Sequence, residues 1–167
     1  MLTLLMLAIA GCAVKQVYNP AALAKNESWA LLPVANLAET PMAGERSQAI
    51  LATWLQKKGI STLHRYPAAD NDTMLPGLNE QHRFRQALDW AKKQGYTYAL
   101  TGSVEEWRYK SGLDGEPAVG LSLRIVDLRN GQVVWAASGS RTGWGYESLS
   151  GTANKLIGKL LNDLDLQ

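Results

Sequence analysis

Cysteine, histidine and phenylalanine are nearly absent from this sequence of 167 residues, which holds one Cys, two His and one Phe. A lone cysteine excludes an internal disulfide. His64 and His82 lie in neither a H-E-x-x-H nor a C-x-x-C spacing, so we predict no metal site and expect two surface histidines. A G-x-S-x-G elbow, a phosphate-binding glycine loop and a dinucleotide fingerprint are also missing. We therefore expect no catalytic set and no cofactor.

An excess of charge of one sign is missing too, since 17 basic residues stand against 15 acidic ones and the formal net charge is +2. This balance gives no reason to expect nucleic acid as a partner. The hydrophobic fraction of 46% is ordinary, and the length suits one domain with its own core. Six Trp and six Tyr are the unusual abundance. Such amphipathic rings favour surfaces that are half apolar and half wet.

The first twelve residues, MLTLLMLAIAGC, form an apolar run that is too short to cross a bilayer as a helix. The run is typical of the hydrophobic part of a secretory signal, although no Lys or Arg precedes it. Its ending, Ile9-Ala10-Gly11-Cys12, fits the lipobox of bacterial lipoproteins, in which the cysteine thiol is lipidated. We predict a signal peptide over residues 1–11 and lipidation of Cys12.

The residues after this cysteine have the composition of a linker. Ala13, rather than Asp, follows the cysteine, which by analogy with known lipoproteins favours sorting to the outer membrane. Asn19-Pro20 breaks any helix in this segment. We predict that residues 12–28 are the lipidated Cys and a flexible tether, and that residues 29–167 are a globular domain close to the membrane.

The body of the chain alternates between strand and helix patterns. Strands are predicted at 29–34, 60–66, 96–109, 119–127 and 132–141, and helices at 45–58, 80–94 and from Leu149 towards Leu164. Asn130-Gly131 signals a two-residue hairpin between the last two strands. The order β-α-β-α-β-β-β-α predicts an α/β (α+β) domain with a single mixed sheet. Its first three strands should be parallel and its last two an antiparallel hairpin.

The stretch YKSGLDGEPAVG, residues 109–120, carries the two carboxylates Asp114 and Glu116 between two predicted strands. Three interpretations stay open: an exposed turn, an acidic rim that faces a ligand, and a catalytic pair. Catalysis by a glycosidase pair would require one desolvated carboxyl group, and a calcium site would require more oxygen ligands. Glu105 and Glu106 are adjacent on a strand, so we expect them on opposite faces.

Trp144 lies between two glycines at the corner that precedes the last helix. A large aromatic in such a place is a core plug, an anchor in a membrane interface, or a subunit contact. The sequence pattern does not distinguish these alternatives.

Several stretches resemble the PelC family, the outer-membrane lipoproteins of bacterial Pel exopolysaccharide export. They are Y-K-S-G-L-D-G-E-P-A-V-G, the hairpin L-S-L-R-I-V-D-L-R-N-G-Q-V-V-W-A-A-S-G and R-T-G-W-G-Y. The lipobox at Cys12 and the strand W-A-L-L-P-V-A-N-L extend the resemblance over most of the chain. The element order is similar, more loosely, to TolB N-terminal-like domains and other periplasmic adaptor lipoproteins.

The resemblance implies a function without catalysis. PelC-like proteins form a dodecameric ring on the periplasmic face of the outer membrane, beneath the β-barrel exporter PelB. The ring would guide a cationic exopolysaccharide towards the pore. Asp114 and Glu116 match the family's acidic loop, and Trp144 matches a membrane-proximal aromatic. Two rivals remain: a lipoprotein activator or adaptor of cell-wall synthesis, and a periplasmic hydrolase or deacetylase.

Overall fold

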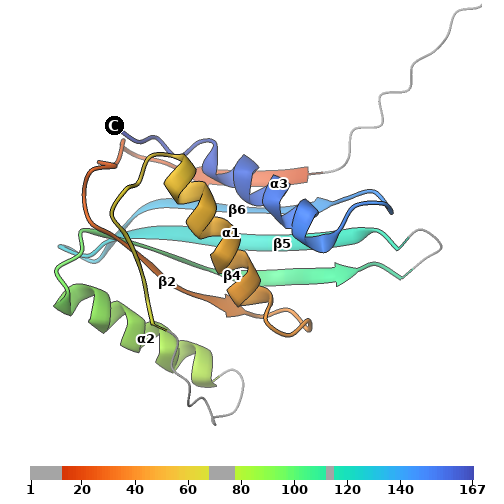
Figure 1. Ribbon diagram of the computed structural model, residues 1–167, viewed down its shortest axis with the longest axis horizontal. Coiled ribbons are helices and arrows are strands. Elements are labelled where there is room, and N and C mark those ends of the chain that lie inside the picture. The colour runs from red at the N-terminus through yellow and green to blue at the C-terminus, as the bar shows by residue number, and fades with distance from the viewer. Residues whose placement is uncertain (1–12, 68–77, 112–114) are drawn as a thin grey trace, which may run out of the picture.

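The computed structural model describes residues 13–67, 78–111 and 115–167 (Figure 1). Its strands form one six-stranded sheet with the order β1-β6-β5-β4-β2-β3. The strands are β1 (Ala13–Tyr18), β2 (Trp29–Asn36), β3 (Leu63–Arg65), β4 (Tyr98–Tyr109), β5 (Pro117–Asp127) and β6 (Gln132–Thr142). The helices are α1 (Ala43–Lys57), α2 (Leu78–Lys93) and α3 (Leu149–Leu161). From β2 onward, the predicted order β-α-β-α-β-β-β-α and the single mixed sheet are confirmed.

The pairing of the strands also follows the prediction. Strand β2 pairs in parallel with both β3 and β4, whereas β4, β5 and β6 pair antiparallel. The connection from β5 to β6 has four residues, 128–131, and is longer than the predicted two-residue turn. The reason is Asp127, whose carboxylate accepts hydrogen bonds from the backbone N–H and the guanidinium of Arg129 and so supports a wider loop. Gly131 ends this loop with a φ of 74°.

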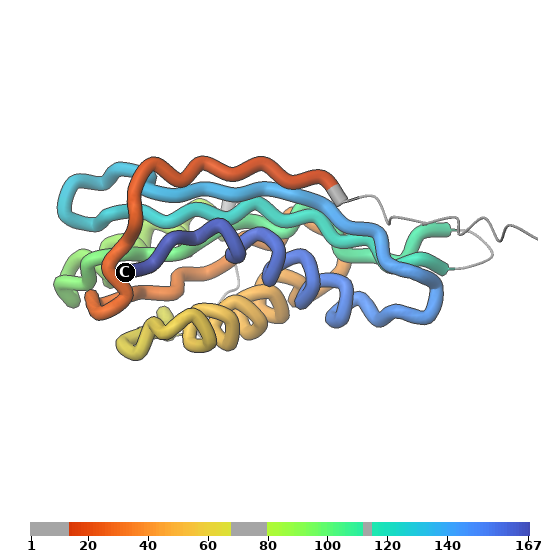
Figure 2. The backbone as a smooth tube through the Cα atoms, turned by 90° about the horizontal axis from the view of Figure 1, so that it is seen from above, coloured from red at the N-terminus to blue at the C-terminus, as the bar shows by residue number. Residues whose placement is uncertain are grey.

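Helices cover the two faces of the sheet unequally. Helices α1 and α3 lie side by side on one face (Figure 2) and bury most of the core, including Trp107 and Trp135. Helix α2 packs on the opposite face, against Ala30 and Leu32 of β2. The alternation of side chains along β2 explains this division, because Leu31 belongs to the core under α1 and α3. The rest of the α2 face carries no helix among the described residues.

The predicted tether over residues 12–28 is wrong for residues 13–18, which form β1. This strand pairs antiparallel with β6 from Ala13 opposite Arg141 to Tyr18 opposite Ala136. Lys15 forms an ion pair with Asp163 beyond the end of α3 and so ties the strand to the opposite end of the chain. The segment has no strong apolar alternation of its own. Its strand conformation depends on pairing with a strand more than a hundred residues away in the sequence.

Residues that follow β1 also dock onto the body. Leu23 is buried, donates its backbone N–H to the carbonyl of Asp165 and accepts from the N–H of Gln167. The predicted strand at 60–66 shrinks to the three residues of β3, since Ile60 is buried in the turn after α1 instead. The chain between β1 and β2 is therefore part of the folded body.

Candidate functional site

Three parts of the chain meet at one end of the sheet. They are the end of β4 with the start of β5, the corner between β6 and α3, and the start of β1. Tyr109 pairs with Pro117, and Gly143 donates its backbone N–H to the carbonyl of Pro117 at 2.8 Å. Ala13 pairs with Arg141 at the same end. We call this region the aromatic end; it comprises Ala13, Tyr109–Ser111, Gly115–Pro117 and Arg141–Ser148.

Exposed aromatic rings give the aromatic end its character. Trp144 is 49% exposed, Tyr109 is 52% exposed, and Tyr146 is fully exposed. The core-plug alternative for Trp144 is therefore wrong, because a core residue would be covered. An anchor in a membrane interface and a subunit contact remain.

Gly143 and Glu147 fix the corner on which Trp144 stands. A side chain at position 143 would place its Cβ 2.6 Å from Oγ1 of Thr152 and 2.9 Å from Pro117, so only glycine fits between α3 and β5. Glu147 donates its backbone N–H to the carbonyl of Trp144 at 2.8 Å and closes the corner into a turn.

The carboxylate of Glu147 is largely covered and lies among cations. Its Oε1 is 3.0 Å from Nζ of Lys155 and 3.7 Å from Nη2 of Arg141, and its Oε2 accepts from the hydroxyl of Thr152. The hydrogen bond from Lys155, together with the charges of Lys155 and Arg141, holds the pKa of Glu147 below its ordinary value. No local pattern singles out Glu147 in the sequence, because its partners lie on two different elements, Arg141 on β6 and Thr152 and Lys155 on α3.

Glu116 and its neighbours close the loop between β4 and β5. Lys110 donates its backbone N–H to the carbonyl of Glu116 at 2.8 Å, and its Nζ lies 4.0 Å from the Glu116 carboxylate. Both side chains are more than two fifths exposed, so this ion pair contributes little to stability. Gly115 has a φ of 51°, as the predicted turn requires. Asp114 lies outside the described residues.

Catalysis gains no support from Glu116. Its carboxylate is exposed and faces a lysine, whereas an acid catalyst would need a desolvated carboxyl group. Within residues 13–67, 78–111 and 115–167, no group of three metal-ligating side chains comes together. His64 and His82 are both exposed, as expected, and the ring of His64 stacks on Tyr96.

Glu105 and Glu106 do not lie on opposite faces, so that prediction is wrong. Val104 pairs with Leu121 and Glu106 with Gly120, which leaves Glu105 as the extra residue of a β-bulge. A Cβ at Gly120 would lie 3.4 Å from that of Glu106 and 3.8 Å from that of Glu105, so both side chains leave on the same side. Glu106 pairs with Arg108, and Glu105 accepts from Ser103.

Membrane insertion through a helix finds no candidate in the described part of the chain, where every helix is too short or too polar to span a bilayer. Cys12, the predicted lipidation site, lies outside the described residues.

No protein-family model and no curated protein sequence matches the chain. Among solved structures, lipoprotein GNA1162 from Neisseria meningitidis has the same fold, with a TM-score of 0.55 and 19% identity over 81% of this chain and 96% of that one. The fold is thus of a class found in bacterial lipoproteins.

The relationship to one family is closer. PelC from Paraburkholderia phytofirmans, solved as a dodecamer, is 38% identical with a TM-score of 0.79, over 93% of this chain and 99% of that one. A single-residue variant of that protein, also a dodecamer, matches equally well and over its whole length. This chain belongs to the PelC family, which confirms the resemblance seen in the sequence.

Proposed function

We propose that this chain is a non-catalytic, lipid-anchored subunit of a homo-oligomeric ring in an outer-membrane exopolysaccharide export complex. The ring guides a cationic polysaccharide of the Pel type to a β-barrel exporter similar to PelB. The observation that carries the proposal is family membership, with a dodecameric relative that matches nearly the whole chain. The aromatic end adds two features that suit such a subunit: exposed aromatic side chains next to the residue that follows Cys12, and an acidic loop.

The position of β1 supports a membrane-facing orientation of the aromatic end. A lipid on Cys12 would be one peptide bond away from Ala13, which pairs with Arg141 at this end. The exposed rings of Trp144 and Tyr146 follow within a few residues. Aromatic side chains of this kind concentrate at the level of lipid headgroups. An acyl anchor and exposed aromatics would together hold this end against the periplasmic face of the outer membrane.

The acidic loop suits the passage of a polycation. Repetition of Asp114 and Glu116 around a closed ring focuses negative potential towards the axis, even though the net charge of each copy is +2. Exposed contacts are screened by salt over about 10 Å, which keeps each of them weak. Lys110 offsets part of the charge of Glu116 and weakens its hold further. Many weak contacts let a polymer slide through the ring.

The rival function, a monomeric lipoprotein activator or adaptor of cell-wall synthesis, would need a long tether to reach its enzyme. Residues 13–18 are instead a strand of the sheet, and residues 23–25 are bonded to the C-terminal segment. Because this N-terminal segment is docked on the folded body, it favours a subunit that lies close to the membrane over an activator on a long tether.

Neutral substitution of both loop carboxylates tests the proposal. In a strain that depends on this protein for export, Asp114→Asn with Glu116→Gln should reduce the secreted polymer severalfold. Removal of the negative charge would leave nothing at the rim to attract a polycation. The control is Asp89→Asn with Asp165→Asn, which removes the same charge from exposed positions on α2 and near the C-terminus. Normal secretion by the loop variant, at normal protein level, would contradict the acidic-rim function.

A further inference from the structure

Over most of its width, one face of the sheet is covered by none of the elements in the described part of the chain. Helix α2 covers β2 on this face through Ala87 and Ala91, which pack on Ala30 and Leu32. The described elements place no helix over β5, β6 and β1 on this side, because α1 and α3 lie on the other (Figures 1 and 2). We call the uncovered part, on β1, β6, β5 and the adjoining half of β4, the open face.

Cross-strand neighbours arrange the open face in rows, because residues paired across antiparallel strands point to the same side. The middle row consists of Gln16, Ser138, Ser122 and Ser103, and Ala35 of β2 lies beside its last residue. The row towards the aromatic end consists of Val14, Ser140, Gly120 and Glu106. The row towards the β5–β6 hairpin consists of Tyr18, Ala136, Arg124 and Thr101. The centre is built almost entirely from serine, alanine and glycine.

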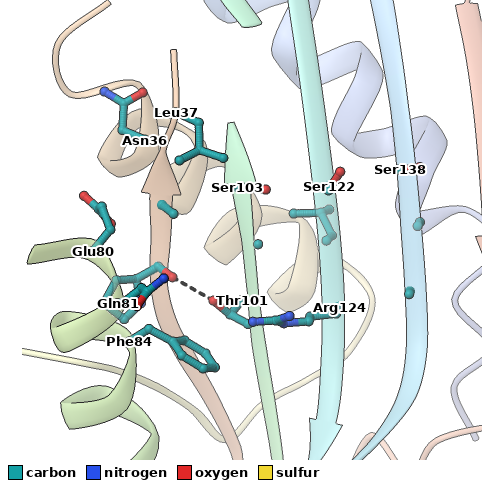
Figure 3. A pocket seen from close by; sticks show the side chains of 16 residues that line it. Asn36, Leu37, Glu80, Gln81, Phe84, Thr101, Ser103, Ser122, Arg124 and Ser138 are labelled. Carbon is teal, nitrogen blue, oxygen red and sulfur yellow. Dashed lines mark hydrogen bonds between the residues drawn. The ribbon is translucent and has the colours of Figure 1, made fainter. Parts of the chain in front are cut away.

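Such a floor is unusual for strands that face water, which normally carry longer polar or β-branched side chains. Short side chains let another protein surface approach the sheet closely. Larger apolar residues border the floor: Val14 and Tyr18 on the β1 side are 65% and 55% exposed, and Leu37 on the β2 side is 64% exposed. Between the floor, Leu37 and Phe84 lies a groove of about 560 Å³ (Figure 3). The open face therefore has larger apolar side chains at its margin and short side chains at its centre, where another protein surface can approach the sheet.

The charge of the open face argues for protein rather than for polymer. Its middle row carries no charged residue, and Arg124 is held with its guanidinium over the ring of Phe84, 5.0 Å from the ring centre. A cationic polysaccharide would be drawn to carboxylates, which gather at the edge of this face around Glu105 and Glu106. Depletion of charge at the centre is typical of protein–protein interfaces.

We propose that the open face is the surface on which one copy of this chain receives the next copy of the assembly. The occupant is a second copy because the dodecameric relative is 38% identical over nearly the full chain. Contact between two open faces would close after two copies, so growth to a larger ring requires a different surface of the neighbour on this face. The inference rests on the homo-oligomer of the proposed function and specifies its interface.

Bulky substitutions on the open face test the inference. Ser122→Trp and Ser138→Trp add a large side chain at the centre of the open face, where it meets solvent in a single copy but clashes with a neighbour. Size exclusion with light scattering on the full-length lipoprotein in detergent measures the mass of the assembly, and the unsubstituted protein should have the mass of a homo-oligomer. Both tryptophan variants should shift most of the protein to the mass of one copy. Gln86→Trp, on the exposed side of α2, should keep the wild-type mass.

Cysteine labelling gives a second measurement, which does not require that the fold of the chain accommodates a tryptophan on the open face. In the intact oligomer, Ser138→Cys should react with a maleimide at least tenfold more slowly than Asn130→Cys at the exposed β5–β6 hairpin, with the wild type as background. Equal labelling rates, or tryptophan variants of wild-type mass, would overturn the inference. Reduced export by an intact Ser138→Trp oligomer would also overturn it, by assigning the face to the polymer. A monomeric wild type would instead refute the homo-oligomer of the proposed function.

Discussion

Trp144 and Tyr146 project from a corner that is rigid at its base. Gly143 lets the corner approach Thr152 and Pro117, and Glu147 closes the turn behind Trp144. An aromatic side chain on such a base loses little conformational entropy when it inserts into a membrane interface or packs against a partner protein. At the scale of single residues, the exposed aromatics are therefore preorganised for contact outside the chain.

Replacement of this indole should affect binding rather than folding. For a form that begins at Ala13, Trp144→Ala should weaken partition onto phospholipid vesicles severalfold, because the largest exposed ring at the aromatic end is lost. The free energy of unfolding should change by no more than about 0.5 kcal/mol, as at other exposed positions. Val133→Ala, at the opposite end of β6 and 43% exposed, is the control for the loss of an exposed apolar side chain away from the aromatic end. A Trp144→Ala protein that unfolds, or that binds vesicles normally, would contradict this assignment.

The corner at the aromatic end joins β6 to α3. Ion pairs of Glu147 with a residue on each of these two elements stabilise the junction. Glu147 lies between Arg141 of β6 and Lys155 of α3. The Nε of Arg141 is buried and has no acceptor among the described residues, so its head group depends on this carboxylate. The N-cap of α3 adds to the junction, since Ser148 accepts from the N–H of Gly151 at 3.0 Å.

The junction should respond to acid in a defined direction. The pKa of Glu147 is lower in the folded protein than its ordinary value of 4.5, so its contribution to stability is present above that pH. The contribution is lost as the pH falls through the folded pKa. Glu147→Gln should therefore destabilise the protein by about 1 kcal/mol at pH 7, and the difference from wild type should shrink as the pH falls through the lowered pKa of Glu147. Thermal unfolding at several pH values measures it, with the exposed Glu39→Gln as control. A difference that does not depend on pH would contradict this account.

Helices and paired strands were predictable wherever the signal is local. The apolar periods at 45–58 and 80–94 place α1 and α2 within about two residues of their observed ends. Strand β1 was not predictable, because the pairing of Val14 and Tyr18 with β6 depends on a segment far along the chain. The bulge at Glu105 likewise has no local signature, and strict alternation put that carboxylate on the wrong face. The site at the aromatic end was predictable only in part, since the partners of Glu147 come together through the fold.

At the scale of the whole molecule, the surfaces divide by chemistry. The aromatic end joins exposed rings and the carboxylate of Glu116 to the residue that follows Cys12, whereas the open face offers small residues with little charge. In a single copy, the part of the sheet face that no described element covers would stay in water. A ring on a membrane uses each surface for a different contact.

Native mass spectrometry of the full-length lipoprotein, released from detergent, measures how many copies of the chain assemble. We expect one dominant homo-oligomer of about twelve copies, because the chain belongs to a family in which a relative is a dodecamer. Each copy should carry the mass of the chain from Cys12 onward together with its acyl groups. A monomer in detergent and in membranes alike, at concentrations well above those in the cell, would contradict the account.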